Sequence, residues 1–106
     1  MKTRMKPKEK TLSAYAIILK ALANETRLEI LYSLYEQPRK WDDLIFELRV
    51  NPKSLRDHLR FLMNSNLVRR KKPAGFELTA AGKAFIDLSL KDIVKTVEKA
   101  VEIAEA

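Results

Sequence analysis

The spacing of apolar side chains predicts four helices before residue 66. The first begins at Thr11. The second runs from an N-cap at Asn24 to the region of Pro38, because proline disfavours helical backbone in the residue before it. A short third helix covers residues 41–48. The fourth follows an N-cap at Asn51 and has a proline at its first position, where a missing N–H costs nothing. Its buried stripe is expected to consist of Leu55, Leu59 and Leu62.

After residue 65 the pattern changes to two short segments and then a long helix. LVRRKK (67–72) and FEL (76–78) flank the tripeptide PAG, which predicts a β-hairpin with a tight loop. Asn66 suits the left-handed residue that ends the preceding helix, and Thr79 is expected to cap the last one. The predicted order is three helices, a turn, a fourth helix, a hairpin and a final helix. This order is that of a winged helix-turn-helix, a mainly α fold with a small β-hairpin.

The composition fits one small domain with an acidic partner. The chain has 106 residues, of which 46% are hydrophobic, enough for one modest core. Its net charge of +7 and pI near 9.8 favour nucleic acid or an anionic membrane surface as the partner. No apolar run reaches the roughly 18 residues of a membrane span, and no secretory signal pattern opens the chain. We therefore expect no membrane partner and a cytoplasmic, nucleoid-associated location.

The charge is distributed unevenly along the chain. Residues 1–79 hold 17 Lys and Arg against 9 Asp and Glu, a balance of +8, whereas residues 80–106 hold 4 against 5, a balance of −1. The opening ten residues, five of them basic and without apolar periodicity, are expected to form a flexible basic N-terminal arm (1–10). The positive field then belongs to a domain over residues 11–79, and the C-terminal helix (80–106) must have a different role. The arm either contacts phosphates or serves only as a solubilising tail.

Enzymatic and metal-binding functions lack the residues they need. The chain has no cysteine and a single histidine, His58, so neither a thiolate metal site nor a Ser-His-Asp triad is expected. Two glycines in all leave no glycine-rich phosphate loop. We expect no catalytic residues, no metal and no cofactor.

The fourth helix carries a basic arc opposite its leucine stripe. At 100° per residue, five polar residues lie about 100–200° away from Leu55: Lys53, Arg56, Asp57, Arg60 and Asn64. Arginine has the fork geometry for bidentate contact with guanine. Alternatively, Asp57 is spaced to form ordinary surface ion pairs with Lys53 and Arg60, or to accept from a cytosine amine. His58 lies at the edge of the buried stripe, where a histidine packs and hydrogen-bonds or touches a phosphate.

Several runs in the right order resemble the ArsR-type winged-helix transcriptional regulators. They are LKALANETRLEILYSL (19–34), DDLIFEL (42–48), NPKSLRDHLRFLMNSNLVRRKK (51–72) and FELTAAGKAF (76–85), and the resemblance covers roughly residues 12–88. The last run is similar to an ending common in winged-helix regulators, archaeal ones included. Family metal sensors carry cysteines in the helix that DDLIFEL matches, or histidines on the last helix; this chain has neither, so metal sensing is not carried over. Asn66 stands where relatives commonly have glycine, and asparagine tolerates the same left-handed backbone.

The resemblance implies that a recognition helix (52–65) enters the major groove and a wing (67–78) lies on the backbone or the minor-groove edge. Because strand residues alternate faces, only about half of the run RRKK can point at DNA. The expected DNA contacts are Asn51, Lys53, Ser54, Arg56, Asp57, His58, Arg60, Arg69, Arg70, Lys71 and Lys72.

The last helix has more apolar surface than a small domain can cover. Apolar residues recur at alternating steps of four and three, which favours an antiparallel two-stranded dimer seam with the first helix alongside. The alternative is a helix that folds back on its own domain. The expected interface residues are Tyr15, Leu19, Ile86, Leu90, Ile93, Val94, Val97, Val101 and Ala104.

Three functions remain open from the sequence. The first is a dimeric, sequence-specific regulator of double-stranded DNA, expected to be a repressor. The second is an architectural or chromatin protein that coats DNA with little sequence preference. The third is a winged-helix interaction module, which would not need a basic recognition face. Neither the operator nor any small-molecule effector is identified by the sequence.

Overall fold

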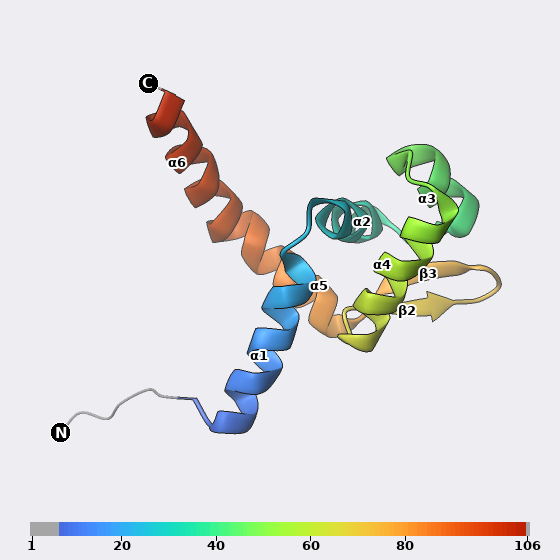
Figure 1. The fold of residues 1–106 in the computed structure, drawn as a ribbon, viewed down its shortest axis with the longest axis horizontal. Coiled ribbons are helices and arrows are strands. Elements are labelled where there is room, and N and C mark those ends of the chain that lie inside the picture. The colour runs from blue at the N-terminus through green and yellow to red at the C-terminus, as the bar shows by residue number, and fades with distance from the viewer. Residues whose placement is uncertain (1–6, 106) are drawn as a thin grey trace.

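A computed structural model describes residues 7–105 and confirms a mainly helical winged helix-turn-helix (Figure 1). The chain runs in order through α1 (Glu9–Leu22), α2 (Glu25–Glu36), β1 (Arg39–Lys40), α3 (Trp41–Leu48), α4 (Pro52–Asn64), β2 (Val68–Lys71), β3 (Gly75–Leu78), α5 (Ala80–Leu88), a π-helical turn η1 (Ser89–Ile93) and α6 (Val94–Glu105). Since α5, η1 and α6 follow without a break, they form one long C-terminal helix.

Side-chain caps begin three of the helices, as the sequence predicts. Asn24 accepts a hydrogen bond of 3.0 Å from the backbone N–H of the third residue of α2. Asn51 does the same at α4, with a distance of 2.8 Å, and Thr79 at α5, with 2.9 Å. Asn66 has a φ of 60°, which confirms the left-handed residue after α4. These caps satisfy N–H groups that no helical carbonyl can reach, and so fix where each helix starts.

The sheet has three strands rather than the two of the predicted hairpin. Its order is β1-β3-β2, with both pairings antiparallel. The added strand, β1, places Arg39 opposite Phe76 of β3. Gly75 lets this strand approach, because a Cβ at this glycine would lie 2.8 Å from the carbonyl oxygen of Arg39.

The first helix starts earlier than the sequence predicts. It begins at Glu9 instead of Thr11, with an acidic residue in the first turn, where the helix dipole favours negative charge. The expected basic arm therefore overlaps α1 at residues 9–10, and its residues 1–6 lie outside the described part of the chain.

The core lies where the last turn of α1, helices α2, α3, α4 and α5, and the sheet meet. The leucine stripe of α4 is buried to 1% exposure or less, as predicted. Gly82 brings α5 against the residue that precedes β2, because a Cβ there would lie only 2.2 Å from the carbonyl oxygen of Leu67. The core residues are Ala21, Ile30, Leu31, Leu34, Leu44, Leu55, Leu59, Leu62, Leu67, Val68, Phe76 and Ile86.

Two helices extend away from this core. In Figure 1, α1 and α6 diverge from a common region beside α5, on the side opposite the sheet and α3. The radius of gyration is 15.9 Å, whereas a compact domain of this size has about 13 Å. None of the described helices is long and apolar enough to cross a membrane.

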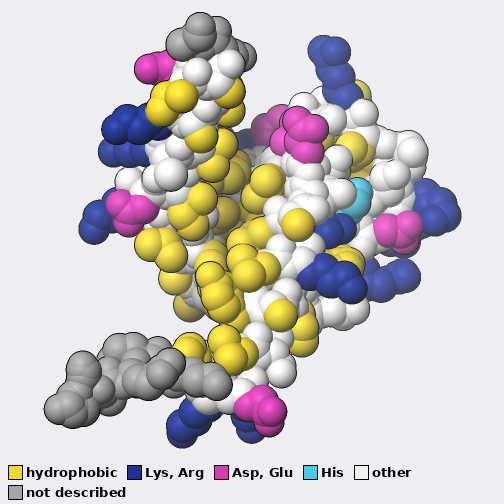
Figure 2. Space-filling model, turned by 60° about the vertical axis from the view of Figure 1, so that its left-hand side comes forward, with side chains coloured by type: hydrophobic (Ala, Val, Ile, Leu, Met, Phe, Trp, Pro, Cys, Tyr) yellow, Lys and Arg dark blue, Asp and Glu magenta, His cyan; other side chains and the backbone are white. Residues whose placement is uncertain are grey.

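The extended helices also expose apolar surface. Of the twelve exposed large hydrophobic side chains in the described residues, ten belong to α1 or to the C-terminal helix. Figure 2 shows them gathered along one side of α6 and continuing toward α1. One face of the molecule is thus apolar and lies apart from the basic residues of α4 and the sheet.

Candidate nucleic-acid interface

The outward face of α4 presents exposed cations, but they are not equivalent. The ammonium group of Lys53 lies 2.9 Å from Oδ2 of Asp57, one helical turn away. This hydrogen bond, more than any other interaction, lowers the pKa of Asp57. Arg56 and Arg60 are exposed, and neither forms an ion pair with any side chain in the described residues. Two guanidinium groups on one helix face are therefore without a direct ion-pair partner among the described residues, although both lie close enough to Asp57 to lower its pKa further.

The N-terminal end of α4 is partly occupied by its own cap. Asn51 uses its side-chain oxygen to accept from the backbone N–H of Ser54. Asn51 is exposed and the Ser54 side chain is half-buried, so their remaining polar groups lie at the rim of the face. Ser54 directly follows Lys53 in the first turn of the helix, and Asn51 is the cap before that turn.

Of the four cations of the wing, the three in β2 divide between its two faces. Arg69 and Lys71 lie on one side, 2.7 Å and 3.8 Å from the carboxylate of Glu77 on the adjacent strand. Arg70 lies on the other side, with its guanidinium 5.5 Å from the centre of the Phe76 ring. Lys72 follows β2 and is exposed. Arg70 thus joins the cations of α4, whereas Arg69 and Lys71 share a carboxylate.

The ring of His58 contacts Arg27 of α2. Its Nδ1 lies 3.3 Å from a guanidinium nitrogen of Arg27, which can only donate, so Nδ1 accepts and the proton of the neutral ring is on Nε2. Burial, and then the nearby positive charge of Arg27, lowers the pKa of His58. His58 therefore packs and hydrogen-bonds within the protein, as one of its two expected roles requires. Only its Nε2–H is left to donate a hydrogen bond to a phosphate.

Arg27 is a central residue that the sequence reading does not single out. Its Nε and one terminal nitrogen donate to the carbonyls of Ala21 and Lys20, at 2.7 Å and 3.0 Å, near the end of α1. Its guanidinium also stacks 4.2 Å from the ring centre of Phe61 in α4. One side chain of α2 therefore holds α1 and the recognition helix together. Its place inside the run LANETRLEIL is the one sequence signal that could have indicated it.

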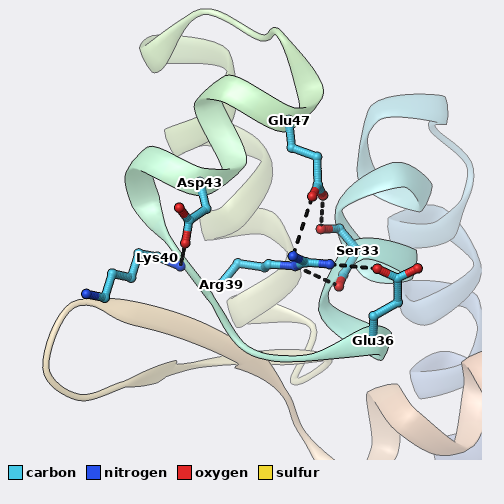
Figure 3. A network of polar contacts seen from close by, with 6 residues as sticks. All are labelled: Ser33, Glu36, Arg39, Lys40, Asp43 and Glu47. Carbon is cyan, nitrogen blue, oxygen red and sulfur yellow. Dashed lines mark hydrogen bonds and ion pairs between the residues drawn. The ribbon is translucent and has the colours of Figure 1, made fainter.

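A second polar network fixes α3 against α2 (Figure 3). The guanidinium of Arg39, in β1, donates to the carbonyl of Ser33 at 3.2 Å and to Glu36 at 2.7 Å. It also lies 3.5 Å from Glu47 of α3, whose carboxylate accepts from the hydroxyl of Ser33. The first helix of the helix-turn-helix is thereby tied to the end of α2 and to the edge of the sheet.

The residues expected at a dimer seam are exposed, with two exceptions. Val94 is half-buried, and Ile86 is buried to 1% exposure in the core. The seam assignment of Ile86 was therefore wrong, because the close approach of α5 at Gly82 turns this side chain inward. The exposed members are Tyr15, Leu19, Leu90, Ile93, Val97, Val101 and Ala104.

The sequence matches a known family across the helix-turn-helix. The profile described as "Bacterial regulatory protein, arsR family" matches residues 24–70, from the N-cap of α2 into β2. Among curated proteins, the transcriptional activator HlyU of Vibrio cholerae is 35% identical over 66 residues, which are 62% of this chain and 61% of HlyU. The aligned region thus spans less than two thirds of that relative. The profile is one of bacterial proteins, and the comparisons give no support for an archaeal type.

Solved structures share the fold. HlyU from Vibrio cholerae has a TM-score of 0.69 and 33% identity, covering 76% of this chain and 92% of that one. The transcriptional repressor BigR from Xylella fastidiosa has a TM-score of 0.65 and 27% identity, covering 80% and 90%. Mb0332 from Mycobacterium bovis, described as a homodimeric winged helix-turn-helix DNA-binding domain, has a TM-score of 0.73, covering 94% and 95%; its 22% identity shows the fold alone. With the profile match and the likeness to HlyU over nearly all of its solved chain, this chain belongs to the arsR family of winged helix-turn-helix transcriptional regulators, which are not enzymes.

Proposed function

We propose that the chain is a homodimeric regulator that recognises specific double-stranded DNA sequences, with α4 in the major groove and the wing on the backbone or minor-groove edge. The observation that carries this proposal is the pair Arg56 and Arg60: both are exposed on one face of α4, and neither is in an ion pair among the described residues. Their helix is held rigidly, because its opposite face is buried in the core. A guanidinium on a rigid helix can make a bidentate contact with guanine.

The remaining cations are better suited to phosphates. Lys53 is already paired with Asp57, and Arg69 with Glu77, so each contributes less net charge. Asn51, Ser54 and the Nε2 of His58 are proposed to donate to the backbone at the rim of α4, and Lys71 and Lys72 to do so from the wing. Phosphate contacts set the position of the protein on the duplex and base contacts set its sequence preference. An architectural protein would have only the first kind.

The test compares binding to the promoter of the protein's own gene with binding to random duplex of equal length, over a range of salt. The wild-type protein should prefer the promoter by about 10³ or more. Arg60→Ala should remove about 1–3 kcal/mol of that preference, because one bidentate contact is lost. Lys72→Ala is the matched control: it should weaken both duplexes equally and reduce the salt slope by about one. Coincident curves for promoter and random DNA would instead establish the architectural function.

The apolar face is proposed to be the dimer interface, with α6 pairing antiparallel to its copy and α1 alongside. Val97 is 54% exposed and Ile93 51%, far more than apolar side chains covered by their own chain. Mb0332, which shares the fold, is described as homodimeric. A two-fold axis through this seam gives two copies of α4, and predicts a palindromic site with half-sites about 10 bp apart, centre to centre.

Val97→Glu should dissociate the dimer and weaken promoter binding with it, because a carboxylate would be buried against apolar side chains. Lys99→Gln makes the same change in charge about 160° away from Val97 around the helix, and should leave the dimer intact. Sedimentation at micromolar concentration distinguishes the two states. A Val97→Glu protein that still sediments as a dimer would exclude this seam.

We propose repression from a cytoplasmic, nucleoid-bound dimer, with residues 11–79 as the DNA-binding unit and 80–106 as the dimerisation helix. Relatives differ in this respect: BigR is named a repressor and HlyU an activator.

A further inference from the structure

A hollow of about 320 Å³ lies between α3, the recognition helix and the wing. Three arginines line it, Arg56 and Arg60 from α4 and Arg70 from β2. The rest of its lining is apolar: Trp41, Leu59, Met63 and Phe76. The volume is at the lower end of the range for small-ligand sites, which is about 300–1,000 Å³.

The arginines line this hollow without an acidic side chain beside them in its lining. The guanidinium of Arg56 lies 5.9 Å from the Trp41 ring centre, and that of Arg70 lies 5.5 Å from the Phe76 ring centre. Ring faces attract cations, so these contacts orient the guanidinium groups without using their N–H donors. The donors remain available to an anion.

The apolar part of the lining provides a matching surface for a flat ring. Leu59 and Phe76 are buried in the core and form a fixed base, whereas Trp41 and Met63 are half-buried and border the opening. Aromatic walls favour stacking with a planar group, and the methionine side chain adapts to its edge. An anionic group beside an aromatic ring therefore matches the two halves of the hollow.

We propose that this hollow binds small planar aromatic carboxylates, and that such a ligand competes with DNA. The carboxylate pairs with the guanidinium groups while the ring lies against Trp41 and Met63, the half-buried apolar residues of the opening. The first part stands on the geometry of the hollow alone. The second rests on the proposed function, because it requires that Arg56 and Arg60 contact DNA. A bound carboxylate would occupy the same N–H donors, so binding of the ligand would release the regulator from DNA.

The binding test uses 2-naphthoate as the probe and the full chain without DNA. The chain has one tryptophan, so the indole N–H resonance of Trp41 is a single NMR signal placed at the hollow. We expect it to shift saturably, with affinity reduced at least about tenfold in Arg70→Gln and for the neutral analogue 2-naphthamide, since a charge-assisted contact is lost in each. The control Lys99→Gln should bind as the wild type does. Affinity that is unchanged in Arg70→Gln or for the amide would overturn the site, as would a shift that never saturates.

The competition test adds 2-naphthoate to the protein bound to its promoter duplex. The apparent Kd for DNA should rise in proportion to ligand occupancy, and rise less in Arg70→Gln. Saturable 2-naphthoate binding with an unchanged DNA affinity would overturn competition and leave the site standing. The same samples separate failure of this proposal from failure of the proposed function. If the proposed function fails, promoter and random duplex bind with equal affinity, whether or not 2-naphthoate shifts the Trp41 signal.

Discussion

Gly82→Ala should lower the free energy of unfolding by at least about 3 kcal/mol, at the upper end of the range for overpacked sites. A Cβ at this position would lie 2.2 Å from the carbonyl oxygen of Leu67 and 3.1 Å from its carbonyl carbon. That backbone cannot move aside easily. The Leu67 N–H bonds to the carbonyl of Leu62, and its own carbonyl accepts from the N–H of Thr79, both at 3.0 Å. Helix α5 must move away instead, and Ile86 would leave the core with it.

Urea unfolding followed by far-UV circular dichroism measures this effect. Ala84→Ser is the control, since it adds one heavy atom at an exposed site on the same helix and should change stability by no more than about 0.5 kcal/mol. A loss below about 1 kcal/mol for Gly82→Ala would mean that α5 shifts freely relative to β2, contrary to the packing described above.

Arg27→Met should cost about 2–3 kcal/mol, because methionine fills similar space but donates no hydrogen bond. The lost interactions are two bonds to carbonyls of α1, the contact with His58 and the stacking on Phe61. Two carbonyls near the end of α1 then lose their charged donor. We expect α1 to detach from α4, and the dimer to weaken as a consequence.

Arg27→Lys separates charge from geometry, since it keeps the charge but cannot form the fork, and should recover only part of the stability. Lys20→Met removes an exposed cation nearby and is the control, with an expected change within about 0.5 kcal/mol. Equal stability of Arg27→Met and Lys20→Met would refute the role of Arg27 as the link between α1 and α4.

The pH dependence of stability provides a second readout for Arg27. The pKa of His58 is lower in the folded protein than its ordinary value of 6.5, so the unfolded chain binds the proton more readily. Above pH 6.5, His58 is neutral in both states and does not lower the free energy of unfolding. As the pH falls from there through the folded pKa, the unfolded chain takes up the proton first and the free energy of unfolding decreases. In Arg27→Met, burial of His58 should still cause part of this loss of stability at low pH. The loss should be smaller than in the wild type, because the positive charge of Arg27 is removed.

The sequence predicts the recognition helix well because independent signals coincide there. The Asn51 cap, a proline at the first helical position and the leucine stripe all agree on the same boundaries and the same buried face. Where one face of a helix is buried, the opposite face follows from helical geometry, so the exposure of Arg56 and Arg60 was predictable as well.

Features that depend on distant parts of the chain could not be predicted in this way. Strand β1 has two residues, too few for an alternating pattern, and exists because β3 pairs with it. The contacts of Arg27 with His58 join residues that are 31 positions apart. Ile86 fits the heptad spacing as well as Leu90 does, and only the close approach at Gly82 decides that it faces inward. In each case the deciding interaction is tertiary.

The π-helical turn η1 sets the direction in which the proposed dimer seam on α6 faces. Its wider turn, marked by the N–H of Val94 bonding to the carbonyl of Ser89, winds the chain less per residue than an α-helix does. Across Ser89–Ile93 the azimuth of α6 therefore lags that of a continuous α-helix by about a quarter turn. The turn therefore changes the rotation about the helix axis between the face of α5 that packs in the core and the apolar face of α6 that is proposed to contact the partner. In the proposed dimer, deleting one residue within this turn would rotate the two copies of α4 relative to each other without altering either. The spacing of the half-sites that they are proposed to read would then change through the length of this turn alone.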